Sequence, residues 1–126
     1  MSRTPMIGVI DDDPSVRAAM ESMLRSYGYD LAIYESAISF LASDVARYCS
    51  CVISDLNMPG MSGLELKRQL RRVGYEIPVI IITASSGTAL SDYARSDGIC
   101  HLLTKPFRAK QLMDYLTMVL AASGRQ

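Results

Sequence analysis

The sequence Val79-Ile80-Ile81-Ile82-Thr83 is a run of four β-branched apolar residues that ends in a hydroxyl. A strand with one solvated face would alternate apolar and polar side chains, so this run predicts a strand buried on both faces. Strands of that kind lie inside parallel sheets that helices cover on both sides. Pro78 precedes the run and suits the first position of a strand. The run therefore predicts an α/β fold with a central parallel strand.

The rest of the chain alternates between short apolar runs and segments of helical periodicity. Four further strands are expected, at residues 6–10, 30–34, 51–54 and 99–103. Helices are expected at about 14–27, 36–41, 63–73, 88–95 and 108–121. Helical spacing places several apolar residues toward the core, among them Val16, Met20, Met23, Leu24, Tyr27, Leu64, Leu70 and Val73. Five β–α units without repeats or linkers predict one domain over residues 1–126, a doubly wound sheet with helices on both faces.

Polar side chains stand at the ends of four of these strands. They are Asp11, Asp12, Asp55, Thr83 and Lys105. The carboxyl ends of parallel strands meet at one edge of a sheet, where open α/β folds bind their ligands. Three carboxylates, a hydroxyl and an ammonium at one edge suit a divalent metal together with a phosphoryl group. The sequence therefore predicts a metal-assisted phosphoryl site at this edge.

Composition narrows the class of protein. The 13 basic and 13 acidic residues cancel, so no overall field favours nucleic acid or an anionic membrane as a partner. No apolar stretch approaches the ~20 residues that span a bilayer. Three cysteines form no disulfide framework, and an odd count without a signal peptide is typical of the reducing cytoplasm. We expect Cys49 and Cys51 to be buried structural thiols rather than a redox pair.

Four motifs in order give the chain a resemblance to a known family. They are Val9–Asp13 (Val-Ile-Asp-Asp-Asp), Val52–Leu66 (Val-Ile-Ser-Asp-Leu-Asn-Met-Pro-Gly-Met-Ser-Gly-Leu-Glu-Leu), Pro78–Ala84 (Pro-Val-Ile-Ile-Ile-Thr-Ala) and Gly98–Phe107 (Gly-Ile-Cys-His-Leu-Leu-Thr-Lys-Pro-Phe). One pair of aspartates is a weak signal, whereas four motifs at the family's spacing are specific. Over essentially its whole length, the chain resembles the receiver domains of two-component response regulators. Its opening half, with Val16-Arg17 and residues 34–41, is most similar to receivers of the FixJ type.

The resemblance implies a fold, a reaction and partners. The family's fold is flavodoxin-like, a five-stranded parallel sheet in the order 2-1-3-4-5 with five helices. Asp55 would accept a phosphoryl group from a histidine kinase, so the chain would be a phosphoacceptor in the cytoplasm and not an enzyme. FixJ-type receivers usually precede a DNA-binding output domain, which this chain does not contain. The face of the fourth helix, fifth strand and fifth helix would form homodimers or contact that output domain.

The resemblance also assigns roles within the site. The implied Mg²⁺ ligands are Asp12, Asp55, the main-chain carbonyl of Asn57 and, through water, Asp11. Thr83 would hydrogen-bond one phosphoryl oxygen and Lys105 would bind another as a point charge. Pro106 would follow Lys105 in a cis peptide bond, which is largely a proline phenomenon. Positioning and charge neutralisation would then make the weakly nucleophilic carboxylate of Asp55 reactive.

Two positions depart from the family's pattern. Leu102 stands where an aromatic residue usually swings inward on phosphorylation, so the usual coupling of that ring to Thr83 lacks its partner. Asn57 stands where FixJ-type receivers commonly have Arg, beside the phosphoryl group, where a side chain influences attack by water.

On activation we expect the weak helix at 88–95 to shift and to expose a face. That face would include Leu90, Tyr93, Leu102 and Tyr115.

Two other functions are compatible with parts of the sequence. Asp11-Asp12-Asp13-Pro14-Ser15 also resembles the Asp-x-Asp-x-Thr start of haloacid-dehalogenase phosphatases. Asp11 would then be the nucleophile and Asp13 the general acid/base, although the chain lacks a late acidic pair for the metal and the Asp55 segment is left unexplained. The second alternative is a receiver fold that serves as an unphosphorylated interaction module. The single histidine, His101, lies within a strand and is expected to be packed rather than phosphorylated.

Overall fold

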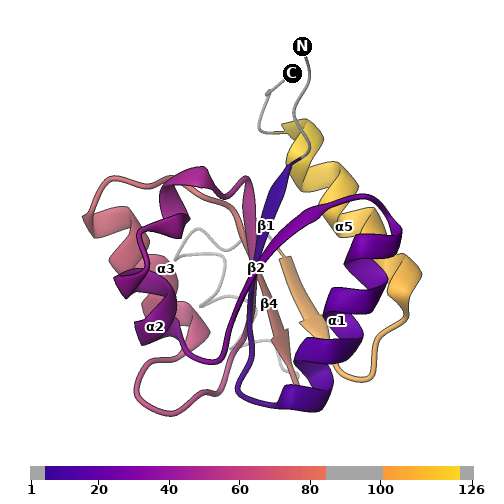
Figure 1. Ribbon diagram of the computed structural model, residues 1–126, viewed down its shortest axis with the longest axis horizontal. Coiled ribbons are helices and arrows are strands. Elements are labelled where there is room, and N and C mark those ends of the chain that lie inside the picture. Colours follow the sequence, from indigo (N-terminus) through magenta and orange to yellow (C-terminus); the bar gives the residue numbers. More distant parts are fainter. Residues whose placement is uncertain (1–4, 85–100, 123–126) are drawn as a thin grey trace.

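The computed structural model describes residues 5–84 and 101–122 as an α/β sandwich around one sheet (Figure 1). Its elements are β1 (Met6–Ile10), α1 (Pro14–Ser26), β2 (Asp30–Tyr34), α2 (Ala37–Ala42), the 3-10 helix η1 (Val45–Tyr48), β3 (Cys51–Asp55), α3 (Gly63–Arg72), β4 (Val79–Thr83), β5 (His101–Thr104) and α5 (Ala109–Ala122). All five strands are parallel, in the order β2-β1-β3-β4-β5. The predicted fold class and strand order are confirmed.

Only four of the five expected helices lie within the residues that the structure describes. Within residues 5–84 and 101–122, four α-helices and one 3-10 helix are present. The helix expected at 88–95, together with Leu90 and Tyr93, lies outside the described residues. Across those same described ranges, no helix is long and apolar enough to cross a membrane.

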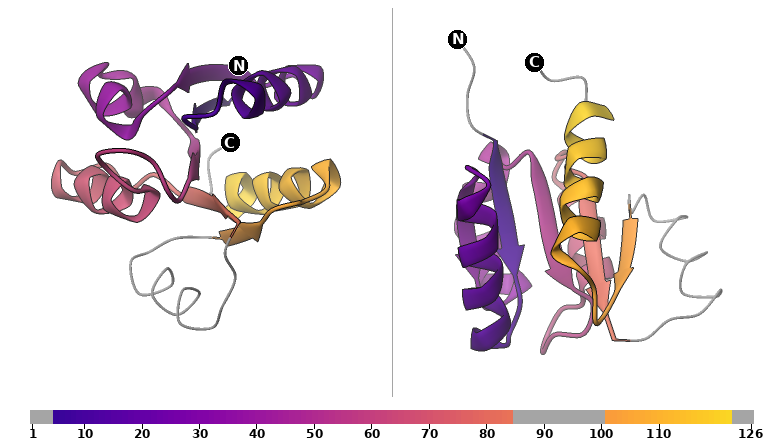
Figure 2. Two further views of the ribbon diagram at one scale, coloured as in Figure 1. Left: turned by 90° about the horizontal axis from the view of Figure 1, so that it is seen from below. Right: turned by 90° about the vertical axis from the view of Figure 1, so that its right-hand side faces the viewer.

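Two cores lie on opposite faces of the sheet, because successive strand residues point to opposite sides. Helices α1 and α5 cover one face, and α2 and α3 cover the other (Figure 2). In β4, Ile80 and Ile82 join the core under α1 and α5, whereas Val79 and Ile81 join the core under α2 and α3. All four side chains are buried. The prediction of a strand buried on both faces is therefore confirmed.

Side-chain caps fix where three helices begin. The carboxylate of Asp13 accepts a hydrogen bond from the main-chain N–H of Ser15 at 2.8 Å, and Pro14 occupies the first helical position of α1. Ser36 and Ser62 cap α2 and α3 in the same way. The caps at Asp13 and Ser62 set where the chain enters α1 and α3 after the loops that follow β1 and β3. They therefore also set the loops that surround the candidate site.

Two residues that were expected to face the core do not. Tyr27 is 57% exposed and Val73 is 63% exposed. Each is the residue after the last helical turn, and the chain then reverses through a glycine of positive φ, Gly28 or Gly74. Helical periodicity no longer applies at these positions, so the prediction was wrong there.

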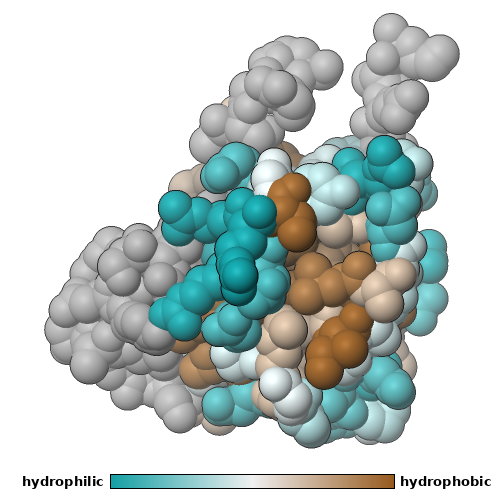
Figure 3. Space-filling view, turned by 90° about the vertical axis from the view of Figure 1, so that its left-hand side faces the viewer, coloured by the Kyte–Doolittle hydropathy of each residue, from teal (hydrophilic) through white to brown (hydrophobic). Residues whose placement is uncertain are grey.

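Part of the face formed by α2 and α3 stays open to solvent. Figure 3 shows hydrophobic residues on this face beside a hydrophilic band. Its exposed or half-buried apolar residues include Ile38, Leu41, Val45, Met58 and Met61. Ile38 lies over Gly60, since a Cβ atom at Gly60 would be 3.0 Å from the Cδ1 atom of Ile38. Helix α2 therefore packs against the loop between β3 and α3.

Candidate functional site

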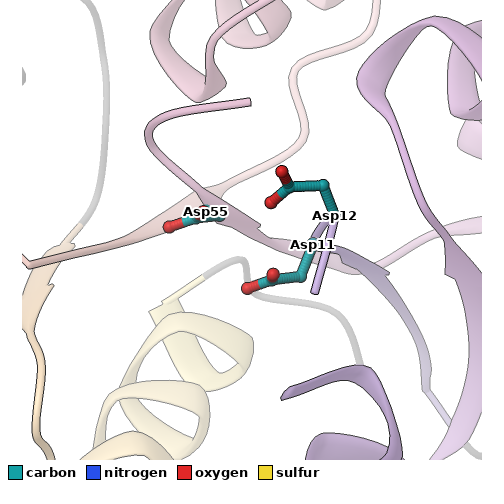
Figure 4. Close-up of side chains that lie close together, drawn as sticks. All are labelled: Asp11, Asp12 and Asp55. Atoms are coloured by element: carbon teal, nitrogen blue, oxygen red, sulfur yellow. The ribbon is translucent and has the colours of Figure 1, made fainter. Parts of the chain in front are cut away.

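Three carboxylates meet at the carboxyl edge of the sheet. The register pairs Ile10 of β1 with Ser54 of β3, so the residues that follow, Asp11 and Asp55, come side by side. Asp12 extends from the same turn, and the carboxylates of Asp11 and Asp12 reach toward Asp55 (Figure 4). One oxygen from each of the three lies within 4.8 Å of the others. The structure therefore brings these three predicted residues into one cluster.

Asp11 is held on several sides by short hydrogen bonds. Its Oδ1 atom accepts from the main-chain N–H of Asp13 at 2.9 Å, and its own N–H donates to the carbonyl of Tyr34 at 3.2 Å. Its main-chain carbonyl accepts from Nη1 of Arg17 at 2.8 Å. The residue is only 4% exposed. Because Oδ1 already binds the turn, Oδ2 is the oxygen of Asp11 that is better placed to act in the site.

Lys105 is the cation nearest to the cluster among the ion pairs of the described residues. Its Nζ atom lies 3.6 Å from Oδ1 of Asp55 and 4.0 Å from Oδ2 of Asp11. The main-chain N–H of Lys105 donates to the carbonyl of Thr83 at 2.7 Å, which joins the ends of β4 and β5. The peptide bond from Lys105 to Pro106 is cis, as predicted. The strand ends thus aim one ammonium between two carboxylates.

The electrostatics of the cluster favour the uptake of a cation. Burial is the largest cause that raises the pKa of both Asp11 and Asp55, and the neighbouring carboxylates raise these pKa values further. The ammonium of Lys105 lowers both pKa values and offsets part of this effect. Oxygen ligands from several carboxylates are the donors that Mg²⁺ prefers. The donor set of this cluster therefore fits a small divalent cation.

Thr83 and Asn57 flank the cluster in different ways. Thr83 ends β4 and is fully buried, beside the strand that carries Asp55. Asn57 is exposed in the loop between β3 and α3. That loop is anchored where the N–H of Leu56 donates to the carbonyl of Ile82 at 2.9 Å. The structure places both predicted residues at the same edge of the sheet as the carboxylates.

Two residues at the site had no role in the sequence-based prediction. Gly63 begins α3, and a Cβ atom there would lie 2.7 Å from the main-chain oxygen of Asp55. Arg17 is half-buried on α1 and contacts the carbonyl of Asp11. A glycine at a helix start and a charged residue on a helix that packs on a sheet are weak signals. Neither shows by itself which residue it contacts across the fold.

Among the described residues, two cysteines and the histidine lie away from this cluster, whereas Cys100 lies outside the described residues. Cys51 is buried in the core under α1 and α5, whereas Cys49 packs against the core under α2 and α3. Burial raises the pKa of Cys49 to about 11. Cys51 is buried as predicted, whereas Cys49 is only half-buried, and the two thiols lie on opposite sides of the sheet rather than as a redox pair. The ring of His101 stacks on Tyr115 with centroids 4.3 Å apart, so it is packed as expected.

An open apolar pocket borders the cluster between α1 and the loop from β5 to α5. Its volume is about 730 Å³. The lining residues are Ser15, Val16, Ala19, Met20, Met23, Lys105, Pro106, Phe107 and Ala109. Lys105 lines this pocket and also pairs with Asp11 and Asp55, so the pocket lies next to the carboxylate cluster.

Comparison with known proteins places this geometry in context. Residues 7–117 match the family model of the response regulator receiver domain. The response regulator protein TodT of Pseudomonas putida is 37% identical over 125 residues, which are 98% of this chain and 55% of TodT. The transcriptional regulatory protein FixJ of Azorhizobium caulinodans is 33% identical over 120 residues, which are 95% of this chain and 57% of FixJ. The chain thus spans about half the length of the curated relatives it matches.

Solved structures agree with these sequence matches. The response regulator StyR superposes with a TM-score of 0.86 and is 34% identical, covering 95% of this chain and 61% of the StyR chain. The crystal structure of FixJ-N superposes with a TM-score of 0.84 and is 28% identical, covering 95% of this chain and 96% of that one. The similarity therefore extends through nearly the whole chain in sequence and in three dimensions.

Proposed function

Since the chain belongs to the family of response regulator receiver domains, we propose that Asp55 is its phosphoacceptor and that residues 1–126 form a single receiver domain. The observation that carries this proposal is the position of the Asp55 carboxylate. It lies 3.6 Å from the ammonium of Lys105 and within one cluster with Asp11 and Asp12. Its side chain is 13% exposed, compared with 5% for Asp11, so Asp55 is the more accessible of the two to a phosphodonor.

The reaction transfers a phosphoryl group and leaves the domain modified. An oxygen of Asp55 forms a bond to phosphorus while the bond between phosphorus and a histidine nitrogen of the donor breaks, and that nitrogen keeps the electron pair. Lys105 binds a phosphoryl oxygen through its ammonium, and the hydroxyl of Thr83 donates to another. Bound Mg²⁺ supplies neutralisation of the charge on the carboxylates and the phosphoryl oxygens. Asp55 is the acceptor in this step, and the domain is not a turnover enzyme.

Metal binding involves the acidic cluster and the loop that follows β3. We assign Asp12, Asp55 and the main-chain carbonyl of Asn57 as ligands, with Asp11 acting through water. The assignment of Asp11 is supported by its Oδ1 atom, which already accepts from the N–H of Asp13. A small cation that retains several waters suits such a partly open set of ligands.

A phosphatase that uses Asp11 as nucleophile fits the geometry less well. Asp11 is 4% exposed, and one of its carboxylate oxygens is occupied by the turn. Asp13, the general acid/base in that alternative, uses Oδ1 to cap α1 at Ser15. Both residues therefore have local structural roles that compete with the catalytic roles of a phosphatase.

The partners of this domain follow from its proposed role as a phosphoacceptor. A histidine kinase is the phosphodonor, and the apolar pocket next to Lys105 offers it a contact surface beside Asp55. The matched residues make up 50% of TdiR, 25% of DctD and 57% of FixJ, and all three relatives are named as transcriptional regulatory proteins. An output domain that binds DNA is therefore the partner to which the domain reports, and the face of β5 and α5 is the surface for that contact or for a homodimer. The cytoplasm is the site of action.

Labelling by acetyl phosphate in the presence of Mg²⁺ tests the proposal. We expect one phosphoryl group on the parent protein, mapped to Asp55 by mass spectrometry, and none after addition of EDTA. Asp55→Asn and Asp12→Ala should both abolish labelling. Asp114→Asn is the matched control, since Asp114 is 60% exposed on α5 and pairs only with Lys110 among the ion pairs of the described residues.

Each alternative gives a different result in this assay. Undiminished labelling of Asp12→Ala would contradict the metal assignment. A phosphoryl group mapped to Asp11, with release of phosphate over many turnovers, would indicate a phosphatase. Absence of labelling in a protein that binds the metal would indicate an unphosphorylated interaction module.

A further inference from the structure

Arg17 is not one of the predicted site residues, but its side chain contacts one of them, Asp11. It lies in the first half of α1, and its side chain is half-buried. Its Nη1 atom donates to the main-chain oxygen of Asp11 at 2.8 Å, six residues earlier in the chain. A hydrogen bond from a charged donor is stronger than one between neutral groups. The guanidinium thus ties helix α1 to the residue that directly follows β1.

The turn that Arg17 contacts presents two of the three carboxylates. Two further hydrogen bonds shape this turn, from the N–H of Asp13 to Asp11 and from the N–H of Ser15 to Asp13. Both are local, and in both a main-chain N–H donates to the side-chain carboxylate of the aspartate two residues earlier. The contact from Arg17 spans from the body of α1 back to the strand end. The orientation of Asp12, which lies between these anchored residues, depends on the turn keeping this conformation.

We propose that Arg17 is a positioning residue for the metal site: by holding the carbonyl of Asp11, it keeps the turn from Asp11 to Asp13 in the conformation that presents Asp11 and Asp12 to a divalent cation. This inference rests on the proposed function, in which these carboxylates bind Mg²⁺. Groups that orient metal ligands without touching the ion commonly affect the affinity about 10- to 100-fold.

The sign of the effect separates positioning from simple electrostatics. A guanidinium close to an acidic site repels a divalent cation. If Arg17 acted only through its charge, its removal would tighten metal binding. If it acts by holding the turn, its removal weakens binding, because the ligands lose their arrangement.

Binding of Mn²⁺, measured by electron paramagnetic resonance of the free ion, is the test. We expect Arg17→Ala to raise the dissociation constant about tenfold. Arg17→Lys keeps a charged donor and should stay within about threefold of the parent. Arg25→Ala is the matched control, because Arg25 lies on the same helix and its exposed side chain pairs with Glu21 at 3.1 Å. It should bind Mn²⁺ as the parent does.

The outcomes distinguish this inference from the proposed function. Arg17→Met keeps the apolar stem and should show the same tenfold loss, which covers the case that Arg17→Ala does not fold. Equal or tighter binding by the Ala or Met variant would overturn the inference, and so would a loss in Arg17→Lys as large as in Arg17→Met. A parent that binds no Mn²⁺ would overturn the metal site of the proposed function together with the inference.

Discussion

Replacing Gly63 by alanine tests how closely α3 must approach the phosphoacceptor strand. The added Cβ atom would lie 2.7 Å from the main-chain oxygen of Asp55, 2.6 Å from Cδ1 of Ile81 and 3.2 Å from Oγ of Ser54. Ile81 and Ser54 are fully buried, and the Asp55 oxygen belongs to the backbone. The space cannot be made by moving an exposed side chain, so the start of α3 or the end of β3 must shift.

The cost follows from these contacts. Insertion of one carbon into a packed core typically lowers the free energy of unfolding by about 1–3 kcal/mol. The better helix propensity of alanine offsets up to about 1 kcal/mol of this loss. We therefore expect a net loss of about 1–2 kcal/mol, which lowers the melting temperature by roughly 4–8 °C in a domain of this size. A shift of the Asp55 backbone toward 1 Å should also slow phosphoryl transfer by about 10-fold or more.

Gly28→Ala is the matched control for this experiment. Gly28 has φ +91° and no atom within 4 Å of its built Cβ position, so alanine there is strained but not crowded. That strain costs about 1–2 kcal/mol. Thermal denaturation should show similar losses for both variants, whereas labelling by acetyl phosphate should slow only in Gly63→Ala. Labelling of Gly63→Ala at the parental rate, or equal slowing of Gly28→Ala, would refute the reasoning.

Three further predictions concern charge, thiol reactivity and activation. Asp11→Asn should raise the melting temperature of the metal-free protein at pH 7, because burial raises the pKa of Asp11 in the folded state and its charged form therefore destabilises the fold. This gain should shrink as the pH falls through the raised pKa of Asp11 in the folded parent, and it should vanish below 3.8, the ordinary value for aspartate, because the carboxyl is then protonated in the folded and the unfolded state. A lower melting temperature for Asp11→Asn throughout would point to a structural cap instead. Cys49, with its pKa raised to about 11, should react with iodoacetamide slowly at pH 8 and faster as the pH rises toward that value; rapid alkylation at pH 8, located by mass spectrometry, would contradict its burial. A beryllofluoride mimic of the phosphoryl group should change hydrogen exchange across residues 84–103. Unchanged protection there, with the mimic bound, would mean that the signal leaves by another route.

Local patterns predicted the sheet and the site well. The unbroken apolar run in β4 required burial on both faces, and Val79 to Ile82 are buried on alternate sides as expected. Polar residues at strand ends predicted the cluster, because parallel strands place their carboxyl ends along one edge. The four motifs predicted the receiver family, which the family model and the relatives confirm.

A prediction failed where the helical period stopped, and residue spacing gave no prediction for short elements or for contacts that cross the fold. Val73 follows the last turn of α3, so its exposure depends on where the helix ends rather than on spacing. The 3-10 helix η1 is too short to show a period. Leu102, at the position of the usual aromatic switch, is half-buried against the core under α2 and α3. Residue spacing alone does not show on which face of the sheet the side chain of Leu102 lies, because that depends on the register of β5.

The order of the strands along the chain and the identity of the residues at their ends were determined by the sequence alone, because side-chain period and turn chemistry are properties of neighbours in the chain. Only the tertiary structure decided that Arg17 holds the carbonyl of Asp11 and that a Cβ atom at Gly63, the first residue of α3, would crowd the main-chain oxygen of Asp55. It also decided that burial raises the pKa values of two carboxylates. These features arise from contacts and desolvation between separate elements, and both exist only once the helices and strands have packed together.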